Sequence, residues 1–254
     1  MMLKTRVMPC LLVQDGRLVK TIQFKKPVYI GDPVNAIKIY NEKEADELII
    51  ADITATVEGR KPPLDLLAEI TSECFMPMAY GGGIRTIDDI RAIFKLGVEK
   101  VAINSYAAEN PAFVSEAARI FGNQSIIASI DVKKTLFGAY KVFSHHGTKN
   151  TGEDPVAYSK RMEELGAGEI LLNSIDRDGM MDGYDCELVK KVTEAVNIPV
   201  IALGGAGEYA DIAKVVQEGG ASAVAAGSLF IYQGRIRSVL INFPLQEELK
   251  RLVP

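Results

Sequence analysis

Short apolar runs rich in β-branched residues alternate with longer stretches of helical periodicity along this 254-residue chain. There are eight such runs: "RVMPCLLV", "ELIIADI", "MPMAYGG", "KVAINS", "SIIASIDV", "EILLNSI", "IPVIALGG" and "AVAAGS". They are apolar at successive positions, which is typical of strands in a parallel sheet that is covered by helices on its faces. Helix start signals stand between them, at Asp32-Pro33, Asn110-Pro111 and Asp154-Pro155. Eight strand–helix units in about 250 residues predict an α/β fold, a (β/α)8 TIM barrel, rather than a doubly wound sheet.

The chain also repeats itself loosely at half its length. "ELIIAD" from Glu47 corresponds to "EILLNS" from Glu169, "YGGGIRT" from Tyr80 to "LGGAGEY" from Leu203, and "VAINS" to "VAAGS". The repeat predicts a barrel built from two similar halves. Because no Pro/Gly/Ser-rich linker divides the sequence, we expect residues 1–254 to form one domain.

Composition argues against several classes of function. The chain is 48% hydrophobic, enough for one large core, and its net charge of -4 gives no overall attraction to nucleic acid or to an anionic membrane. It has neither a signal-peptide pattern nor an apolar run of about 18 residues, so we expect a cytoplasmic protein. Cys10, Cys74 and Cys186 are widely spaced and the only histidines are His145 and His146. We therefore expect no disulfide framework, no metal and no cofactor.

Glycine and small polar residues follow four of the predicted strands, at the barrel end where sites of this fold are built. Glycines permit tight turns, and they also let backbone N–H groups approach a phosphate. Since the clusters are related by the half-length repeat, we expect two phosphate sites and a substrate phosphorylated at both ends. The candidate ligands are Gly83, Asn104, Ser105, Gly205, Gly227 and Ser228.

Acidic residues follow the sixth apolar run, in "NSIDRDGMMDGYD" from Asn173 to Asp185. A solvated loop would explain this composition. The position at a strand end favours the alternative that Asp176, Asp178 and Gly179 face a ligand.

Asp131 ends the fifth apolar run and is the candidate catalytic residue. At the mouth of a barrel it could act as general acid or base. The alternative is a structural role, such as pairing with Lys133 or Lys20. In the half-length repeat the equivalent position of the first run is Leu12, so one half has a carboxylate where the other has an aliphatic side chain.

Four charged residues stand at the opposite ends of the predicted strands: Arg6, Glu47, Lys100 and Glu169. Unpaired charges in such a place are costly, so we expect them to pair with one another. The ring could be a plug of salt bridges that closes the barrel floor, or a gate.

Over nearly its whole length the chain resembles the HisF family, the cyclase subunits of imidazole glycerol phosphate synthase. The segments that carry the resemblance are "DGRLVK", "GDPV", "DELIIADITA", "GGGI", "KVAIN", "IDVKK", "GTKNTG", "GAGEILLNSIDRDG" and "GGAG". The resemblance implies a lyase-type barrel that forms a heterodimer with a HisH-like glutaminase. It implies that ammonia passes through the barrel and is used at the top to cleave and cyclise a bisphosphorylated ribulosyl intermediate.

The resemblance also implies roles for individual residues. Asp131 matches the general acid of the family, and Lys20 and Asp52 match supporting polar residues near the mouth. The glycine and serine clusters match the two phosphate sites. The four charges at the floor, Arg6, Glu47, Lys100 and Glu169, match the ammonia gate.

Leu12 departs from the family pattern, which has a second essential Asp there in a "CLDV"-like sequence. Cyclisation needs one group to accept a proton while another donates it, and Leu does neither. Asp15 is a weak substitute, because it already matches the Asp of "DGR". "CLLV" and "VKTIQFKKPVYIGDPVNAIKIYNEKE" resemble instead paralogues that, with a HisH-like glutaminase, pass ammonia to a sugar amidotransferase in bacterial surface-polysaccharide (lipopolysaccharide) synthesis.

Three functions remain open from the sequence. The first is an ammonia-conducting subunit that feeds a separate acceptor. The second is a cyclase of histidine biosynthesis, which makes imidazole glycerol phosphate and AICAR. The third is a sugar-phosphate isomerase of a related single-chain barrel. Leu12 counts against the second and third, and the four floor charges favour a barrel with a partner.

Overall fold

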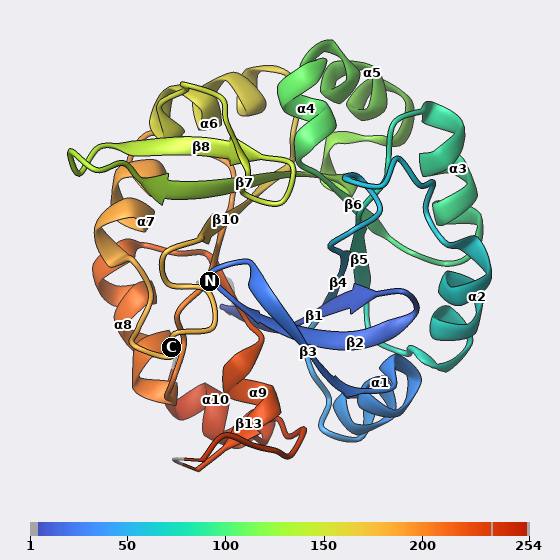
Figure 1. Cartoon of the computed structure of the whole chain (residues 1–254), viewed down its shortest axis with the longest axis vertical. Helices are drawn as coiled ribbons and strands as arrows, with labels where there is room; N and C mark the ends of the chain where they lie inside the picture. Colours follow the sequence, from blue (N-terminus) through green and yellow to red (C-terminus); the bar gives the residue numbers. More distant parts are fainter. Residues whose placement is uncertain (1–4, 235, 253–254) are drawn as a thin grey trace.

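The computed structural model describes residues 5–234 and 236–252, and in this part of the chain eight parallel strands close into a barrel. β1 pairs with both β12 and β4, and β7 pairs with β10, which completes the ring. Figure 1 shows the strands encircled by helices. The predicted (β/α)8 barrel is confirmed. The barrel strands are β1 (Arg6–Gln14), β4 (Leu48–Asp52), β5 (Met78–Gly81), β6 (Lys100–Ile103), β7 (Ile126–Lys134), β10 (Glu169–Ser174), β11 (Val200–Leu203) and β12 (Ala223–Ala226).

Helices follow the strands, and several start at the signals noted in the sequence. The Asp32 side chain accepts a hydrogen bond from the Asn35 N–H at 3.0 Å, and Asp154 accepts one from the Val156 N–H at 2.9 Å. Both caps satisfy amide groups that the first helical turn leaves unpaired. The helices are α1 (Pro33–Glu42), α2 (Leu64–Glu73), α3 (Ile87–Lys95), α4 (Ser105–Glu109), α5 (Ala112–Phe121), η1 (Asn123–Ser125), α6 (Pro155–Glu164), α7 (Cys186–Thr193), α8 (Tyr209–Gly219), α9 (Ser228–Ile231) and α10 (Gln246–Leu252).

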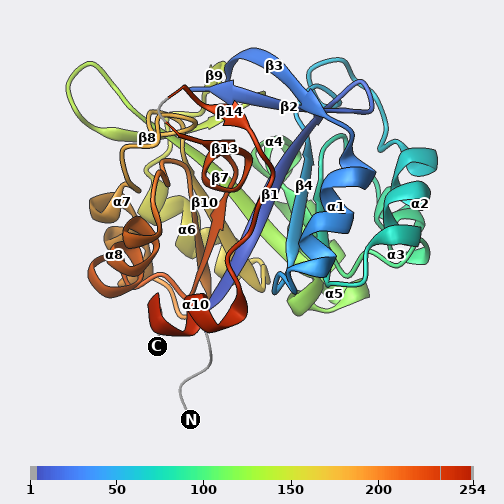
Figure 2. The same cartoon turned by 90° about the horizontal axis from the view of Figure 1, so that it is seen from below.

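The first strand of each half continues beyond the barrel into an antiparallel hairpin. β1 pairs with β2 (Arg17–Ile22), which pairs with β3 (Lys25–Gly31). In the second half β7 pairs with β8 (Tyr140–Ser144), which pairs with β9 (Lys149–Asn150). The hairpins gather at one end of the barrel, opposite α10 (Figure 2). The sequence predicted the two-half repeat but not these hairpins.

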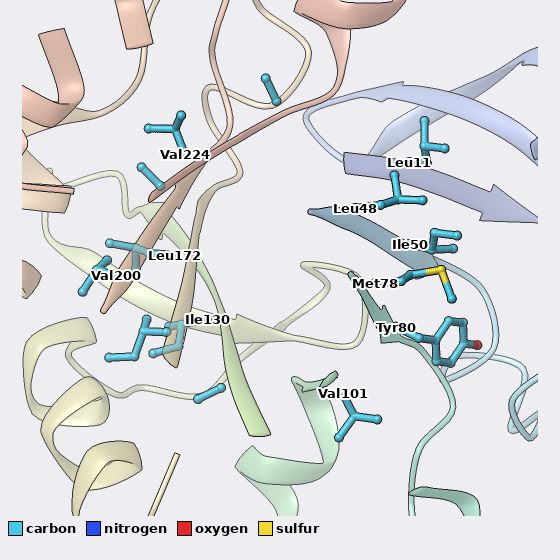
Figure 3. Close-up of a cluster of buried hydrophobic side chains, with 14 of the residues drawn as sticks. Leu11, Leu48, Ile50, Met78, Tyr80, Val101, Ile130, Leu172, Val200 and Val224 are labelled. Atoms are coloured by element: carbon cyan, nitrogen blue, oxygen red, sulfur yellow. The ribbon is translucent and has the colours of Figure 1, made fainter. Parts of the chain in front are cut away.

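The apolar side chains of the barrel strands form two clusters, one outside the ring of strands and one in its lumen. Alternate residues such as Leu11, Ile50 and Tyr80 point outward and pack under the helices (Figure 3). The residues between them point into the lumen, where Cys10 and Ile49 belong to a smaller cluster against which Leu12 packs. Side chains of a strand alternate between its faces, so Leu12 is directed inward.

The remaining elements lie near the carboxyl-terminal end of the chain. β13 (Tyr232–Gln233) and β14 (Ser238–Val239) form a short separate hairpin. Among the described residues, we find no helix with the length and apolarity needed to cross a bilayer.

Candidate functional site

A cavity opens at the carboxyl ends of the barrel strands. Eleven of the twelve residues that the sequence assigned to the upper site line it. The exception is Asp176, which lies outside the cavity wall and whose Oδ2 accepts a hydrogen bond from the Lys134 N–H at 2.8 Å. Leu12 lines the cavity as well. The eleven are Lys20, Asp52, Gly83, Asn104, Ser105, Asp131, Asp178, Gly179, Gly205, Gly227 and Ser228.

Asp131 is held by two amides within this cavity. Its Oδ2 accepts a hydrogen bond from Asn104 Nδ2 at 3.1 Å, and its Oδ1 accepts one from Asn173 Nδ2 at 3.3 Å. Burial raises the pKa of Asp131 to about 7, with the charge of Asp178 acting in the same direction and the two amides opposing it. A carboxyl with this pKa exchanges a proton near neutrality, as a general acid or base must.

Lys20 does not pair with Asp131, because it is buried against Asp178. Lys20 Nζ lies 3.1 Å from Asp178 Oδ1, and Thr21 Oγ1 donates to Asp178 Oδ2 at 2.9 Å. The alternative pairing of Asp131 with Lys20 is therefore wrong. Asp178 instead fastens the first hairpin to the loop that follows β10, since the Phe24 N–H also donates to it at 3.3 Å.

Asp52 organises the loop after β4. Its Oδ1 accepts from the backbone N–H groups of Thr54 and Ala55 at 3.0 and 2.9 Å, and Arg60 Nη1 lies 3.2 Å from Oδ2. Asp52, Asp131 and Asp178 are the carboxylates that line the cavity within the described residues. Two of them have a cationic partner, and Asp131 is the one held by neutral groups.

Backbone packing leaves no room for a side chain at two of the strand-end glycines, Gly83 and Gly205. A Cβ at Gly83 would lie 2.5 Å from the Arg60 carbonyl oxygen, and one at Gly205 would lie 2.1 Å from that of Gly183. A Cβ at Gly227 would lie 3.1 Å from Lys20 Cε. Tight packing by itself therefore accounts for glycine at positions 83 and 205.

The two serines of the predicted phosphate clusters differ in their surroundings. Both begin short helices rather than ending strands, because β6 stops at Ile103 and β12 at Ala226. The Ser105 hydroxyl accepts from the His145 N–H at 2.9 Å and donates to Asn104 at 3.1 Å. The Ser228 hydroxyl is buried and has no hydrogen-bond partner among the described residues.

Sequence reasoning missed several residues of the cavity wall. Asn173 pairs in register with Asp131 across β10 and β7, and its place at a strand end was the available signal. Phe24 and His146 come from the two hairpins and line the mouth. Their rings stack with centroids 5.2 Å apart, and His146 Nε2 lies 2.9 Å from the Phe24 carbonyl oxygen. Burial lowers the pKa of His146 and so favours its neutral ring, while the Phe24 carbonyl and the charge of Asp178 act in the opposite direction.

At the opposite end of the barrel the four predicted floor charges form a closed ring. Arg6 lies 2.5 Å from Glu47 and 3.0 Å from Glu169, and Lys100 lies 2.9 Å from Glu47 and 3.1 Å from Glu169. Burial lowers the pKa of Arg6, but the charges of Glu169 and Glu47 outweigh it and the net pKa is raised. Each cation thus contacts both carboxylates, as the sequence led us to expect.

Comparison with known protein families matches residues 6–237 to the family described as "Histidine biosynthesis protein". A Leptospira interrogans protein provisionally named imidazole glycerol phosphate synthase subunit HisF is 50% identical over 252 residues, which cover 99% of each chain. The chain belongs to the HisF family. The family named from the sequence motifs is confirmed, and HisF proteins are subunits of an enzyme complex.

Two further HisF relatives are similar over nearly their whole length. A Pseudomonas aeruginosa protein provisionally named subunit hisF2 is 49% identical over 243 residues, 96% of this chain and 97% of the relative. The imidazole glycerol phosphate synthase subunit HisF of Alkaliphilus metalliredigens is 46% identical over 231 residues, 91% of this chain and 92% of the relative.

Gly83→Ala tests the packing requirement of the strand-end glycines. Gly83 has φ +69° and its Cβ would meet backbone, whereas Gly16 has φ +74° and open space around it. Both substitutions incur the left-handed strain of about 1 kcal/mol, and Gly83→Ala adds an overpacking cost of about 1 to 3 kcal/mol. Denaturant unfolding should show a larger loss in the free energy of unfolding for Gly83→Ala than for Gly16→Ala. Equal losses in the two variants would contradict the argument.

Asp131 gives folding stability a pH dependence of defined sign. Its pKa is about 7 in the folded protein against a usual value of 3.8. Between these values the folded state holds a proton that the unfolded state has lost, so the free energy of unfolding falls as pH rises, by at most about 4 kcal/mol. The free energy of unfolding, measured near pH 4 and near pH 8, should fall less between these two pH values for Asp131→Asn than for the wild type. An identical fall would show that Asp131 is not perturbed.

Proposed function

We propose that this HisF-type barrel, acting in the cytoplasm as a single domain, receives ammonia from a HisH-like glutaminase and passes it to a sugar amidotransferase of surface-polysaccharide synthesis. The observation that carries the proposal is the contrast between the two halves at the cavity. Asp131 is in register with Asn173 in the second half, whereas Leu12 is in register with Ala51 in the first. One half therefore presents a proton-transfer group and the other presents methyl groups.

Neither of the other two carboxylates that line the cavity in the described part of the chain takes the place of the missing one. Asp178 is engaged by Lys20 and Thr21, and Asp52 by Arg60 and two backbone amides. Asp15 is exposed in the turn between β1 and β2 and is not among the residues that line the cavity. Loss of one positioned proton-transfer group typically lowers a rate by about 10²- to 10⁴-fold, so we expect an impaired cyclase.

The interior of the barrel suits the movement of neutral ammonia. Above the ring of floor charges, the lumen is lined by apolar and small side chains, among them Met8, Ala79, Ala102 and Ala225. An apolar lining favours neutral ammonia over ammonium, because an unpaired ion is costly there. We propose that the glutaminase docks at the floor and that Arg6, Glu47, Lys100 and Glu169 act as the gate.

The upper cavity also supports binding of a phosphorylated small molecule. We propose that the clusters at Gly83, Asn104 and Ser105 and at Gly205, Gly227 and Ser228 are its phosphate sites. The unpartnered hydroxyl of Ser228 is a donor that such a ligand would satisfy. Lys20 supplies a buried positive charge beside Gly227.

A second candidate function is the cyclase reaction of histidine biosynthesis, with Asp131 as general acid. It is favoured by the retention of a carboxyl with a pKa of about 7 in the cavity that both glycine–serine clusters line. Turnover of the bisphosphorylated ribulosyl substrate with saturating ammonium salt separates the two functions, because it bypasses the glutaminase. We expect turnover at least about 10²-fold below that of an Asp-containing HisF. A comparable rate would establish the cyclase instead.

Leu12→Asp should restore part of this reaction. The new carboxylate would face the same cavity as Asp131 and supply the missing proton-transfer group, raising turnover by about tenfold or more. Leu12→Asn is the matched control, since it is polar and of similar size but exchanges no proton. No difference between the two variants would mean that the rest of the cyclase site has also diverged.

Asp131→Asn should abolish any cyclase turnover and leave ammonia transfer intact.

Lys100→Ala tests the gate. It removes one of the two cations that hold Glu47 and Glu169, while Arg6 still contacts both. We expect the ratio of acceptor amidation to glutamine hydrolysis to change, with a folded barrel and a cooperative melting transition. A collapse of the melting temperature would identify the ring as a structural plug.

A further inference from the structure

The two hairpins that leave the barrel differ in charge from the rest of the chain. We define the hairpin platform as residues 15–31 and 133–150. It contains eight Lys and Arg residues and one acidic residue, Asp15. The whole chain has 29 Lys and Arg against 33 Asp and Glu, so the remainder has 21 basic and 32 acidic residues. Apart from Lys20, which is buried against Asp178, the basic residues of the platform are at least partly exposed.

The hairpin platform also exposes large apolar side chains. Leu136 and Phe137, at the tip of the second hairpin, are 102% and 98% exposed. On the first hairpin Ile22, Val28 and Tyr29 are 45%, 56% and 61% exposed. Figure 1 shows the second hairpin projecting past the ring of helices. Exposed apolar side chains that stand among charged residues are typical of an interaction surface.

Protection of a sheet edge explains only part of this pattern. Within the described residues β3 pairs only with β2 and is an edge strand, where Lys25, Lys26 and Pro27 would discourage pairing with other chains. That role does not account for the exposed Val28 and Tyr29 on the same strand. It does not account for Leu136 and Phe137 either, since they lie in a turn.

The two hairpins meet at the mouth of the cavity. Phe24 of the first stacks on His146 of the second, and both rings line the cavity. The His146 Nε2 to Phe24 carbonyl distance of 2.9 Å joins the hairpins directly. A protein bound to the hairpin platform would therefore lie against the opening of the site, at the end of the barrel remote from the floor charges (Figure 2).

We propose that the hairpin platform is the docking surface for the enzyme that accepts the ammonia, an inference that rests on the proposed function. The surface predicts a partner that presents acidic and apolar groups to the two hairpins. Ammonia that escapes into neutral water is protonated and lost as a nucleophile, so an acceptor gains from covering the mouth. A bilayer would satisfy the lysines and the apolar tips but would close the mouth without taking ammonia.

The test is glutamine-driven amidation by a purified sugar amidotransferase, with this chain and its glutaminase. The two variants are Lys25→Glu/Lys26→Glu and Leu136→Ser/Phe137→Ser, at exposed positions outside the cavity. We expect each to lower amidation about tenfold or more at limiting protein concentration. Glutamine hydrolysis, and amidation driven by ammonium salt, should stay within about twofold of wild type, because neither needs the docked complex. Lys160→Glu/Lys214→Glu, on exposed positions of α6 and α8, is the matched charge control and should behave as wild type.

The outcomes separate this inference from the proposed function. If the wild-type chain does not support glutamine-driven amidation while ammonium salt does, the proposed function fails and the docking inference fails with it. If wild type supports amidation and both platform variants match it, only the docking inference fails. It also fails if the variants keep amidation but lose cosedimentation with vesicles of phosphatidylglycerol and phosphatidylcholine, which would identify the platform as a lipid-binding surface.

Discussion

The chemistry of this protein depends on one constraint, the two-residue period of strands that close into a ring. Every second residue of each barrel strand is forced into the lumen, so the strands stack their inward side chains in layers. Charged residues begin the strands and form the floor ring, apolar residues fill the middle, and polar residues line the cavity at the carboxyl ends. Both clusters are apolar because the strands are buried on both faces, by the helices outside and by one another in the lumen.

Because both halves are layered in the same way, each inward position has an equivalent position in the other half of the repeat. Leu12 and Asp131 occupy the same layer, and each is followed by an antiparallel hairpin. Among the described cavity carboxylates, ion pairing removes Asp52 and Asp178 from proton transfer and burial leaves Asp131 with a pKa of about 7. The two halves thus have one architecture and different chemistry, as expected when a site diverges while its scaffold is retained.

In each half of the repeat a hairpin extends beyond the barrel. The two hairpins connect the cavity with the outer surface. Asp178 ties the first hairpin to the loop after β10, and the Phe24–His146 stack ties it to the second hairpin. The cavity wall and the exposed platform are therefore parts of one connected structure. Loops of a TIM barrel vary without cost to its core, so a surface of this kind can arise while the floor and the lumen stay unchanged.

The sequence by itself determined the barrel, its half-repeat, the four floor charges and eleven residues of the upper cavity, but not Asn173, Phe24 or His146. The strands, the helix caps and the strand-end glycines follow from local patterns, because they are set by neighbours in the chain, whereas Lys20 and Asp52 were identified by resemblance to the HisF family. Only the tertiary structure decided which groups meet. The pairing of Lys20 with Asp178, the two amides on Asp131, and the His146–Phe24 contact join residues more than 25 positions apart. Burial and ion pairing are properties of the closed ring and its hairpins, so protonation and exposure could not be determined from the order of residues alone.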